Sequence, residues 1–265
     1  MPTELSPHNP RIEAVRDLRT PRGRRAGRRF AAEGPTLLEE AERTGLRPRE
    51  IYATQAGLGR FDPGRFEMAG TAVFVVTDRV FARLTDLETP TGIIALFDLP
   101  ERTAAEVLAR PGPVLLLAGV SDPGNAGTLV RSAEAFGAAG VLFGHGGADP
   151  FAPKVIRAAM GSLFRLPVAT VEPDELLAAA LAAGRPVVAT DVDGEDLSVV
   201  GLPANAVLAI GNERRGVRDW LPRWDRAVRI PQRDAAESLN AAVAGSIVLY
   251  EASRCQESCQ VAEKP

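Results

Sequence analysis

Cysteine and histidine are scarce in this sequence. The two cysteines, Cys255 and Cys259, both lie near the end of the sequence, so a disulfide framework is excluded and a reducing cytoplasm is the expected compartment. The two histidines, His8 and His145, are far apart, and no HExxH or CxxC motif accompanies them. The sequence therefore predicts no metal centre.

Long apolar runs are also missing. No uninterrupted apolar stretch approaches the roughly 20 residues that cross a bilayer. The opening stretch, MPTELSPHNP, has no apolar core of the kind found in secretion signals. With 45% hydrophobic and 25% charged residues, the composition is that of a soluble globular protein. We therefore expect a cytoplasmic protein that does not associate with membranes.

Lysine is nearly absent, and the basic residues are almost all arginine. The net charge of −3 argues against a general nucleic-acid binder, but the charges are unevenly distributed. The segment PRGRRAGRR, residues 21–29, is dense in arginine and suits contact with RNA phosphates. The alternative is a solvated surface in a chain that prefers arginine to lysine. The candidate RNA-binding residues of this segment are Arg22, Arg24, Arg25, Arg28 and Arg29.

Two further basic residues, Lys154 and Arg157, lie in a segment predicted to be a helix, Ala152–Met160. Their side chains could contact RNA phosphates, or they could simply decorate the surface of the helix. The sequence leaves both interpretations open.

Predicted strands and helices alternate along the whole chain, which indicates an α/β protein. Residues 1–98 are predicted to form a small α/β domain, and residues 99–113, rich in proline and charge, are expected to be a linker with a possible helical turn around Ala104–Leu108. Residues 114–254 alternate at the spacing of a parallel sheet with helices on both faces. Residues 255–265 are expected to be a flexible tail.

Two apolar runs near the C-terminus, Ala206–Ile210 and Ala227–Ile230, are predicted strands that stop at a glycine and a proline. The loops that follow, 211–216 and 231–237, would meet at one edge of a parallel sheet. Small-ligand sites form at this edge, at the carboxyl ends of the strands. Ser238 is a predicted N-cap for a long helix after the second loop.

Three segments carry a resemblance to a known family: DPGNAGTLVRSAEAFG (122–137), IGNERRGV (210–217) and IPQRDAAESLN (230–240). In order and spacing they resemble the motifs of the SpoU/TrmH branch of the SPOUT RNA methyltransferases. The resemblance extends from Val114 to about Ser253, and the region before it resembles the substrate-binding domain of rRNA-directed members. It implies S-adenosylmethionine as cofactor, an RNA ribose 2′-hydroxyl as acceptor, and a deep trefoil knot in the catalytic domain.

The resemblance also implies catalytic roles. Arg131 follows Asn125 in an N-x-G-x-x-x-R pattern and is implied to engage the target ribose and its phosphate. Because a guanidinium stays protonated in proteins, we interpret Arg131 as a positioning group, with a substrate phosphate as a possible proton acceptor. Glu213 is implied to hold Asn125 or the incoming nucleotide. Ser238 and Asn240 complete the implied catalytic set.

The implied cofactor site consists mainly of backbone groups and apolar side chains at the strand ends. Its residues are Leu208, Ile210, Gly211, Asn212, Ile230, Leu239 and Asn240. The sequence departs from the family pattern at Gln232, where a hydrophobic residue, often methionine, is common.

Other functions fit the sequence less well. A dinucleotide-dependent oxidoreductase would need a G-x-G-x-x-G turn after the strand that begins at Val114, and the sequence there is GVSDPGNAG. A non-catalytic RNA-binding protein would be expected to have degraded motifs, and here the motif residues are intact. Among RNA substrates, 23S ribosomal RNA is favoured over tRNA, because a separate N-terminal recognition domain is typical of the rRNA-directed relatives.

The predicted helix Ser238–Ala252 is apolar or small on nearly every side. A helix with so little polar surface is usually buried on more than one side. We therefore expect a homodimer that forms through this helix.

Overall fold

A computed structural model describes residues 2–233 and 238–262. The chain forms two compact units, which we describe separately. The first unit comprises Met1–Pro100 and Phe151–Phe164, and the second comprises Glu101–Pro150 and Arg165–Pro265.

The first unit contains a five-stranded sheet with the order β1-β4-β3-β5-β2. β5 runs antiparallel to its neighbours β2 and β3, whereas β1, β4 and β3 are parallel. The strands are β1 (Thr3–Glu4), β2 (Arg29–Glu33), β3 (Glu50–Ala53), β4 (Ala72–Val75) and β5 (Ile93–Asp98).

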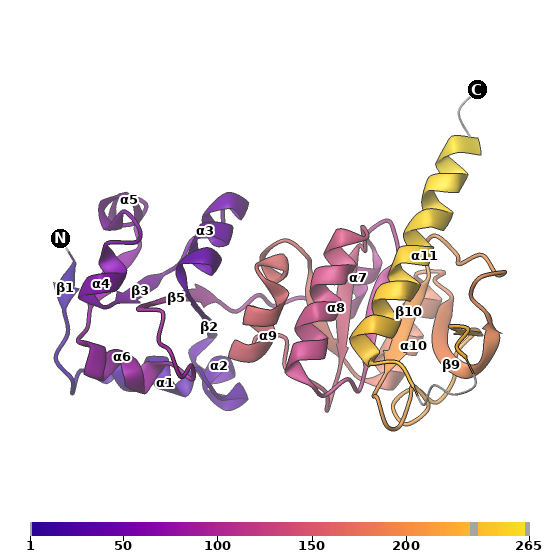
Figure 1. Cartoon of the computed structure of the whole chain (residues 1–265), viewed down its shortest axis with the longest axis horizontal. Helices are drawn as coiled ribbons and strands as arrows, with labels where there is room; N and C mark the ends of the chain where they lie inside the picture. Colours follow the sequence, from indigo (N-terminus) through magenta and orange to yellow (C-terminus); the bar gives the residue numbers. More distant parts are fainter. Residues whose placement is uncertain (1, 234–237, 263–265) are drawn as a thin grey trace. The chain divides into compact units, whose positions relative to one another are not determined.

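Helices cover both faces of this sheet (Figure 1). One face carries α1 (Pro10–Asp17), α2 (Pro21–Gly27) and α6 (Asp78–Leu84). The other carries α3 (Pro35–Thr44), α4 (Gln55–Leu58) and α5 (Pro63–Met68). The helical spacing of Ile12 and Val15 places both in the core with Phe81 of α6, which buries the apolar stripe of α1.

The segment 151–164 packs with the first unit, although it lies in the sequence between two strands of the second. It contains α9 (Pro153–Ala159) and the 3-10 turn η1 (Ser162–Phe164). The Phe30 ring of β2 lies 4.9 Å from that of Phe151 and 6.3 Å from that of Phe164. Lys154 and Arg157 therefore belong to the first unit.

The second unit is built on six strands in the order β11-β9-β10-β6-β7-β8, and every neighbouring pair is parallel. The central strands β6 and β10 are fully or nearly fully buried along their apolar residues, as expected for a parallel sheet covered on both faces. The strands are β6 (Val114–Ala118), β7 (Gly140–Gly144), β8 (Val168–Val171), β9 (Val187–Asp196), β10 (Val207–Gly211) and β11 (Arg226–Arg229).

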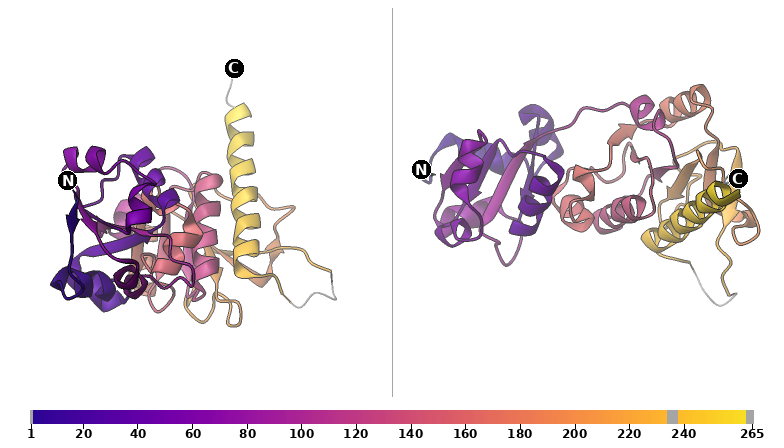
Figure 2. Two further views of the ribbon diagram at one scale, coloured as in Figure 1. Left: turned by 60° about the vertical axis from the view of Figure 1, so that its left-hand side comes forward. Right: turned by 90° about the horizontal axis from the view of Figure 1, so that it is seen from above.

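α7 (Ala104–Leu108) and α10 (Pro173–Ala182) pack in the core on one face of this sheet. On the other face α11 (Ala241–Ala262) runs alongside α8 (Pro123–Ala135), as Figures 1 and 2 show. Gly245 permits this close approach, because a Cβ there would lie 2.3 Å from a methyl carbon of Leu129. The hydroxyls of Ser132 and Ser246 are 2.7 Å apart and join the two helices.

The long C-terminal helix begins later than the sequence predicts. Asn240 is its N-cap, because its Oδ1 accepts the amides of Ala242 (2.9 Å) and Val243 (3.3 Å). The prediction of Ser238 as the cap was wrong, since Ser238 lies outside the helix. The helix also continues to Ala262, where a flexible tail was expected from residue 255.

The segment expected to be a linker, residues 99–113, contains α7. Thr103 and Glu106 form a reciprocal capping box that starts this helix. Val107 and Leu108 are then buried in the core of the second unit. Part of this segment is therefore folded against the sheet and is more than a connection.

Candidate active site

The loops after β6 and β10 are tied together at the carboxyl edge of the sheet. β6 and β10 pair in parallel, so both strands end at the same edge of the sheet. The side-chain amide of Asn212 donates to the carbonyl oxygen of Gly119 and to the hydroxyl of Ser121, both at 3.3 Å. Its Oδ1 accepts the amide of Arg214 at 3.0 Å. One asparagine therefore fixes the loop 211–216 against the loop that precedes α8.

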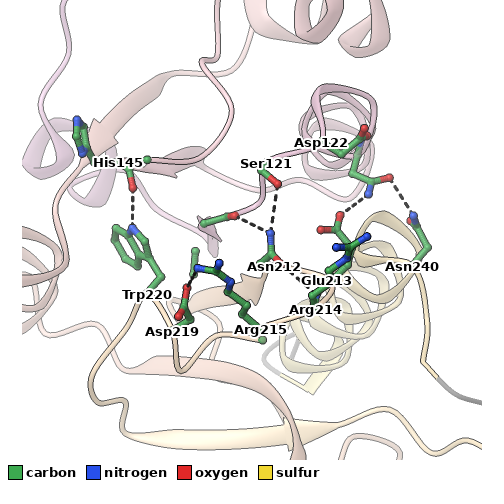
Figure 3. A pocket seen from close by; sticks show the side chains of 15 residues that line it. Ser121, Asp122, His145, Asn212, Glu213, Arg214, Arg215, Asp219, Trp220 and Asn240 are labelled. Carbon is green, nitrogen blue, oxygen red and sulfur yellow. Dashed lines mark hydrogen bonds and ion pairs between the residues drawn. The ribbon is translucent and has the colours of Figure 1, made fainter.

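A chain of hydrogen bonds then joins the three sequence motifs (Figure 3). The Nδ2 of Asn125 donates to Oε1 of Glu213, and the Oδ1 of Asn125 accepts from Nδ2 of Asn240 at 3.0 Å. These residues are 88 and 115 positions from Asn125 in the sequence. The predicted contact of Glu213 with Asn125 is therefore present in the structure.

Two helix N-termini point at this chain of side chains. Asp122 caps α8 by accepting the amide of Asn125 at 2.7 Å, and Asn240 caps α11. The N-terminus of a helix carries partial positive charge and unpaired amides, which favour an anionic group nearby. The site is thus suited to a substrate with a phosphate.

An open cavity of about 930 Å³ adjoins these residues in the second unit. Trp220 and His145 form its other wall, where the indole Nε1 donates to the carbonyl oxygen of His145 at 2.9 Å. A Cβ on Gly144 would lie 2.6 Å from the Trp220 ring, so only glycine leaves room for the indole. The cavity is lined by Ala118, Gly119, Ser121, Asp122, Asn125, His145, Gly146, Asn212, Glu213, Arg214, Arg215, Gly216, Asp219, Trp220 and Asn240.

Several of these lining residues were not predicted from the sequence. The Asp122 cap could have been identified, because an aspartate three residues before Asn125 and directly before a proline is a helix-start signal. The sequence gives no such signal for Trp220 and His145, because their place in the cavity wall depends on a contact between residues 75 positions apart.

Arg131 does not line the cavity. It is exposed on α8, and it has no hydrogen-bond or ion-pair partner among the residues that the structure describes. Its guanidinium is therefore available to a ligand that approaches from outside.

The residues predicted to bind the cofactor fall into two groups. Asn212 and Asn240 line the cavity. Leu208 and Ile210 are buried in β10, and Gly211 ends that strand. Ile230 and Leu239 are half-buried, on either side of residues 234–237, which make up most of the predicted loop 231–237 and lie outside the described part of the chain. Ser238 is exposed.

The arginine-rich segment of the first unit divides into structural and exposed residues. Arg24 is 2% exposed, and its Nη1 donates to the carbonyl oxygen of Leu18 at 2.7 Å. Its assignment to RNA binding was wrong, because a buried guanidinium cannot reach a phosphate. Arg22, Arg25 and Arg28 are exposed.

Arg29 belongs to a charge cluster around the buried carboxylate of Glu50. Arg11 and Arg29 each donate to Oε1 of Glu50 at 2.8 Å, and the Tyr52 hydroxyl donates to Oε2 at 2.5 Å. Burial raises the pKa of Glu50, but these hydrogen bonds and positive charges outweigh it and lower the pKa overall. Burial and the Glu50 carboxylate raise the pKa of Tyr52.

The two basic residues of α9 also differ. Arg157 makes a two-pronged ion pair with Asp86, at 2.7 and 3.1 Å, so its fork of donors is already occupied. Lys154 is exposed. Within the described residues, no group of three or more side chains could hold a metal ion, and no helix has the length and apolarity to cross a membrane.

Known proteins match both parts of the chain. Residues 112–250 match the SpoU rRNA Methylase family, and residues 9–95 match the MRM3-like substrate binding domain. The chain is 33% identical over 247 residues to the 23S rRNA (guanosine(2553)-2′-O)-methyltransferase RlmP of Bacillus subtilis, a match that covers 92% of this chain and 96% of that protein. It is 30% identical over 257 residues to the 23S rRNA (adenosine(1067)-2′-O)-methyltransferase of Streptomyces laurentii, covering 93% of each.

Solved structures give the same result. The AdoMet-bound rRNA methyltransferase from Sinorhizobium meliloti superposes with a TM-score of 0.84 at 30% identity, over 95% of this chain and 97% of that chain. The SpoU methyltransferase AviRb from Streptomyces viridochromogenes, in complex with AdoMet, has a TM-score of 0.81 at 28% identity, over 95% and 99%.

The parallel sheet, the joined motifs and these neighbours define an α/β methyltransferase of the SPOUT class that uses S-adenosylmethionine. The chain belongs to the SpoU rRNA methylase family. The family predicted from the three motifs is confirmed, and so is the α/β fold class predicted from the alternation of strands and helices. The strand ends also suit the cofactor chemically, because apolar Leu208 and Ile210 belong to β10, which ends at Gly211 next to a cavity that Gly119 and Asn212 line.

Proposed function

We propose that this protein transfers a methyl group from S-adenosylmethionine to a ribose 2′-hydroxyl of 23S ribosomal RNA. The observation that carries the proposal is the hydrogen-bonded chain Glu213–Asn125–Asn240, which joins all three motifs beside a cavity at the carboxyl edge of a parallel sheet. The relatives described above are named for a guanosine and an adenosine. Their common target is thus the ribose rather than the base.

The cofactor would be held at the ends of β10 and β11 and at the start of α11. When bound, S-adenosylmethionine supplies an electrophilic methyl group on its sulfonium. The protein's task is then to align the acceptor hydroxyl, and alignment of this kind can contribute roughly 7–11 kcal/mol. The residues proposed to hold the cofactor are Leu208, Ile210, Gly211, Asn212, Ile230, Leu239 and Asn240.

Asn125, Glu213 and Asn240 would orient the target nucleotide from one side of the cavity. Arg131, with its donors unoccupied, would hold the ribose and its phosphate from the outer surface of α8. Because Arg131 keeps its proton, the hydroxyl proton would leave to a phosphate oxygen of the substrate. Ser238, exposed at the edge of the third motif, completes the proposed catalytic set.

The first unit would bind the RNA outside the target nucleotide. Its exposed Arg22, Arg25, Arg28 and Lys154 could contact phosphates directly. Arg29 would act together with Glu50, which fixes one edge of its guanidinium and leaves the side chain 37% exposed.

We further infer that the protein is a cytoplasmic homodimer with a knotted second unit. The scarcity of cysteine supports the compartment. The outer face of α11 supports the dimer, because Val243 and Tyr250 are each 48% exposed. The family membership supports the deep trefoil knot.

The proposal is tested by incubating the purified protein with unmodified 23S ribosomal RNA and S-adenosylmethionine, and mapping ribose 2′-O-methyl groups. A single new 2′-O-methyl group is expected. Methylation of tRNA instead would assign the chain to another substrate, and a methyl group on a base would contradict the chemistry.

A further inference from the structure

One wall of the cavity in the second unit is an indole ring, that of Trp220. Among the described residues that line the cavity, only Ala118 and Trp220 are apolar, and the others are polar, charged or glycine. The Trp220 side chain is half-buried, so part of its ring is open to the cavity. A flat aromatic surface in an otherwise polar cavity suits a ligand that has a flat ring of its own.

The protein holds this indole in a fixed position. Trp220 lies in a turn between Val217 and Leu221, which are both fully buried, and its amide donates to the carbonyl oxygen of Val217 at 3.1 Å. The indole Nε1 donates to the carbonyl oxygen of His145 at 2.9 Å. Because the ring is already oriented and its one polar atom is already bonded, little side-chain entropy would be lost when a ligand packs on it.

Two glycines make room for the ring across the ends of β6 and β7. A Cβ on Gly144, the last residue of β7, would lie 2.6 Å from the ring. A Cβ on Gly119, which directly follows β6, would lie 3.6 Å from the Trp220 Cβ. The indole therefore lies against the backbone of these two strand ends, and the rest of the ring lines the cavity.

The sheet order separates this ring from the proposed cofactor residues. The order is β11-β9-β10-β6-β7-β8, so β6 and β7 lie on the opposite side of β10 from β9 and β11. The cofactor residues were assigned to β10, to the end of β11 and to the start of α11. Figure 3 shows Trp220 and Asn240 at opposite sides of the site, with Asn212 between them. The indole thus faces the place of the target nucleotide rather than that of the cofactor.

We propose that Trp220 stacks on the base of the nucleotide whose ribose is methylated. The inference rests on the proposed function. The cavity of about 930 Å³ falls within the range of roughly 300–1,000 Å³ that is usual for small-ligand sites. Bases that are splayed out of an RNA loop are commonly bound by stacking on an aromatic side chain. Such stacking accepts every base, so Trp220 holds the nucleotide without selecting its identity.

The test combines a change in the protein with a change in the RNA. The substrate is a fragment of 23S ribosomal RNA that contains the methylated nucleotide, made with its natural base or with an abasic ribose that keeps the 2′-hydroxyl. For the wild type, removal of the base should lower kcat/KM about tenfold or more, the value of one stacked base. For Trp220→Leu, the natural fragment should already show this loss, and removal of the base should change little further, because both changes remove the same contact.

Trp220→Phe keeps a flat ring and should retain most of the wild-type kcat/KM. The matched control is Trp224→Leu, which removes the only other tryptophan of the chain, in a separate hollow lined by Leu177 and Leu181. It should respond to base removal as the wild type does. Calorimetric affinity for S-adenosylmethionine should be the same in all of these variants, and urea unfolding checks their folds.

Fluorescence tests the contact with Trp220 itself unchanged. In Trp224→Phe the emission comes from Trp220 alone, and the natural fragment should quench it more strongly than the abasic fragment does. Equal quenching by the two fragments would contradict the stacking.

An equal loss on base removal in the wild type and in Trp220→Leu would overturn the inference and leave the proposed function standing. Reduced affinity for S-adenosylmethionine in Trp220→Leu would also overturn it, because the ring would then contact the cofactor. A wild-type protein that transfers no methyl group to ribosomal RNA would remove the proposed function and the inference together.

Discussion

Asn240 links the start of a helix to the proposed catalytic chain through one side chain. Its Oδ1 caps α11, and its Nδ2 donates to Asn125. Asn240→Asp should keep the stability, because aspartate caps as well as asparagine. It should lose most methyl transfer, because a carboxylate cannot donate to the Asn125 oxygen. Asn240→Ala should lose transfer and also about 1 kcal/mol of unfolding free energy.

Urea unfolding and radiolabelled methyl transfer, measured on both Asn240 variants, separate the two roles. Wild-type turnover in Asn240→Asp would show that the bond to Asn125 has no part in the reaction.

Arg131 is the second residue with a specific expected effect. Arg131→Ala should leave the fold and cofactor binding nearly intact, because the side chain is exposed and makes no hydrogen bond or ion pair within the described residues. Methyl transfer should fall roughly 100-fold or more, as when a preorganised donor is lost from a transition state. Arg131→Lys should restore little, since an ammonium lacks the planar fork of donors. Calorimetric cofactor binding is measured beside methyl transfer to ribosomal RNA.

Lost cofactor affinity in Arg131→Ala would move this residue to a different role, and near-normal turnover would refute a catalytic one.

For single residues, the sequence predicts those site residues that stand in a local motif. Asn125, Glu213 and Asn240 were identified because each stands in a recognisable motif, and the structure brings them within hydrogen-bonding distance. The burial of Arg24 was not predictable, because PRGRRAGRR gives each arginine the same local environment. Only the packing of α2 on α1 decides which guanidinium points inward to the Leu18 carbonyl.

At the scale of elements, an ion pair between Arg218 and Asp191 holds the irregular part of β9, which lies between Ala189 and Glu195. Arg218 donates to both oxygens of Asp191, at 2.9 and 3.3 Å, and the Asp191 side chain is only 8% exposed. The hydrogen bond from Arg218 is the main cause that lowers the pKa of Asp191. A carboxylate whose pKa is lower in the folded than in the unfolded chain stabilises the fold above its unfolded pKa of about 3.9, and loses this contribution as the pH falls.

Asp191→Asn should therefore cost about 1–3 kcal/mol of unfolding free energy at pH 7, the usual effect of losing a charged hydrogen bond. The difference from the wild type should shrink below about pH 4. The Asp191 carboxylate is then protonated first in the unfolded chain and, as the pH falls further through its lowered folded pKa, in the folded chain. Denaturant unfolding from pH 7 to pH 3 gives both values. A difference that stays constant with pH would show that the ion pair does not cause it.

Element boundaries were predicted best where an apolar run has a sharp end. The predicted strand 206–210 differs from β10 (Val207–Gly211) by only one residue at each end, because the apolar run ends clearly at Gly211. The helical turn predicted at Ala104–Leu108 is α7, but its packing in the core was not predicted, because proline content alone does not separate a linker from a short capped helix. The N-cap of α11 was misplaced because serine and asparagine cap almost equally well, so tertiary contacts decide between them.

For the whole molecule, the division into two units predicts separable binding functions. The double variant Arg22→Ala, Arg25→Ala should weaken RNA binding and make it less dependent on salt. The slope of log affinity against log salt concentration should fall in magnitude by up to about 0.7–0.9 for each phosphate contact that is lost. Cofactor affinity should not change. The matched control is Arg43→Ala, Arg65→Ala, which removes two exposed charges from α3 and α5 of the same unit. Equal effects of the two variants would mean that only net charge matters.

The membership of residues 151–164 in the first unit was beyond prediction from the sequence. The strand–helix alternation continues through this segment without interruption, so its periodicity places it with the second unit. Its actual partners are aromatic rings far away in the sequence, Phe30 and Phe97, and no local pattern encodes such pairings.

The last prediction for the whole molecule concerns its oligomeric state. α11 packs one side on α8 and β10, yet Val243 and Tyr250 remain 48% exposed on another. An apolar strip on a helix of small residues favours close packing with the same helix of a second copy around a two-fold axis. The wild type should therefore have twice the chain mass of 28.1 kDa in solution. Val243→Glu should have the mass of one chain with its fold intact, because a buried unpaired charge opposes association.

Light scattering at micromolar concentration measures the mass, and circular dichroism checks the fold. The control is Leu181→Glu, which places the same charge on α10 at a leucine that is 80% exposed, and it should remain dimeric. A wild-type protein with the mass of a single chain would contradict the dimer. A dimer that survives Val243→Glu would place the interface elsewhere than this side of α11.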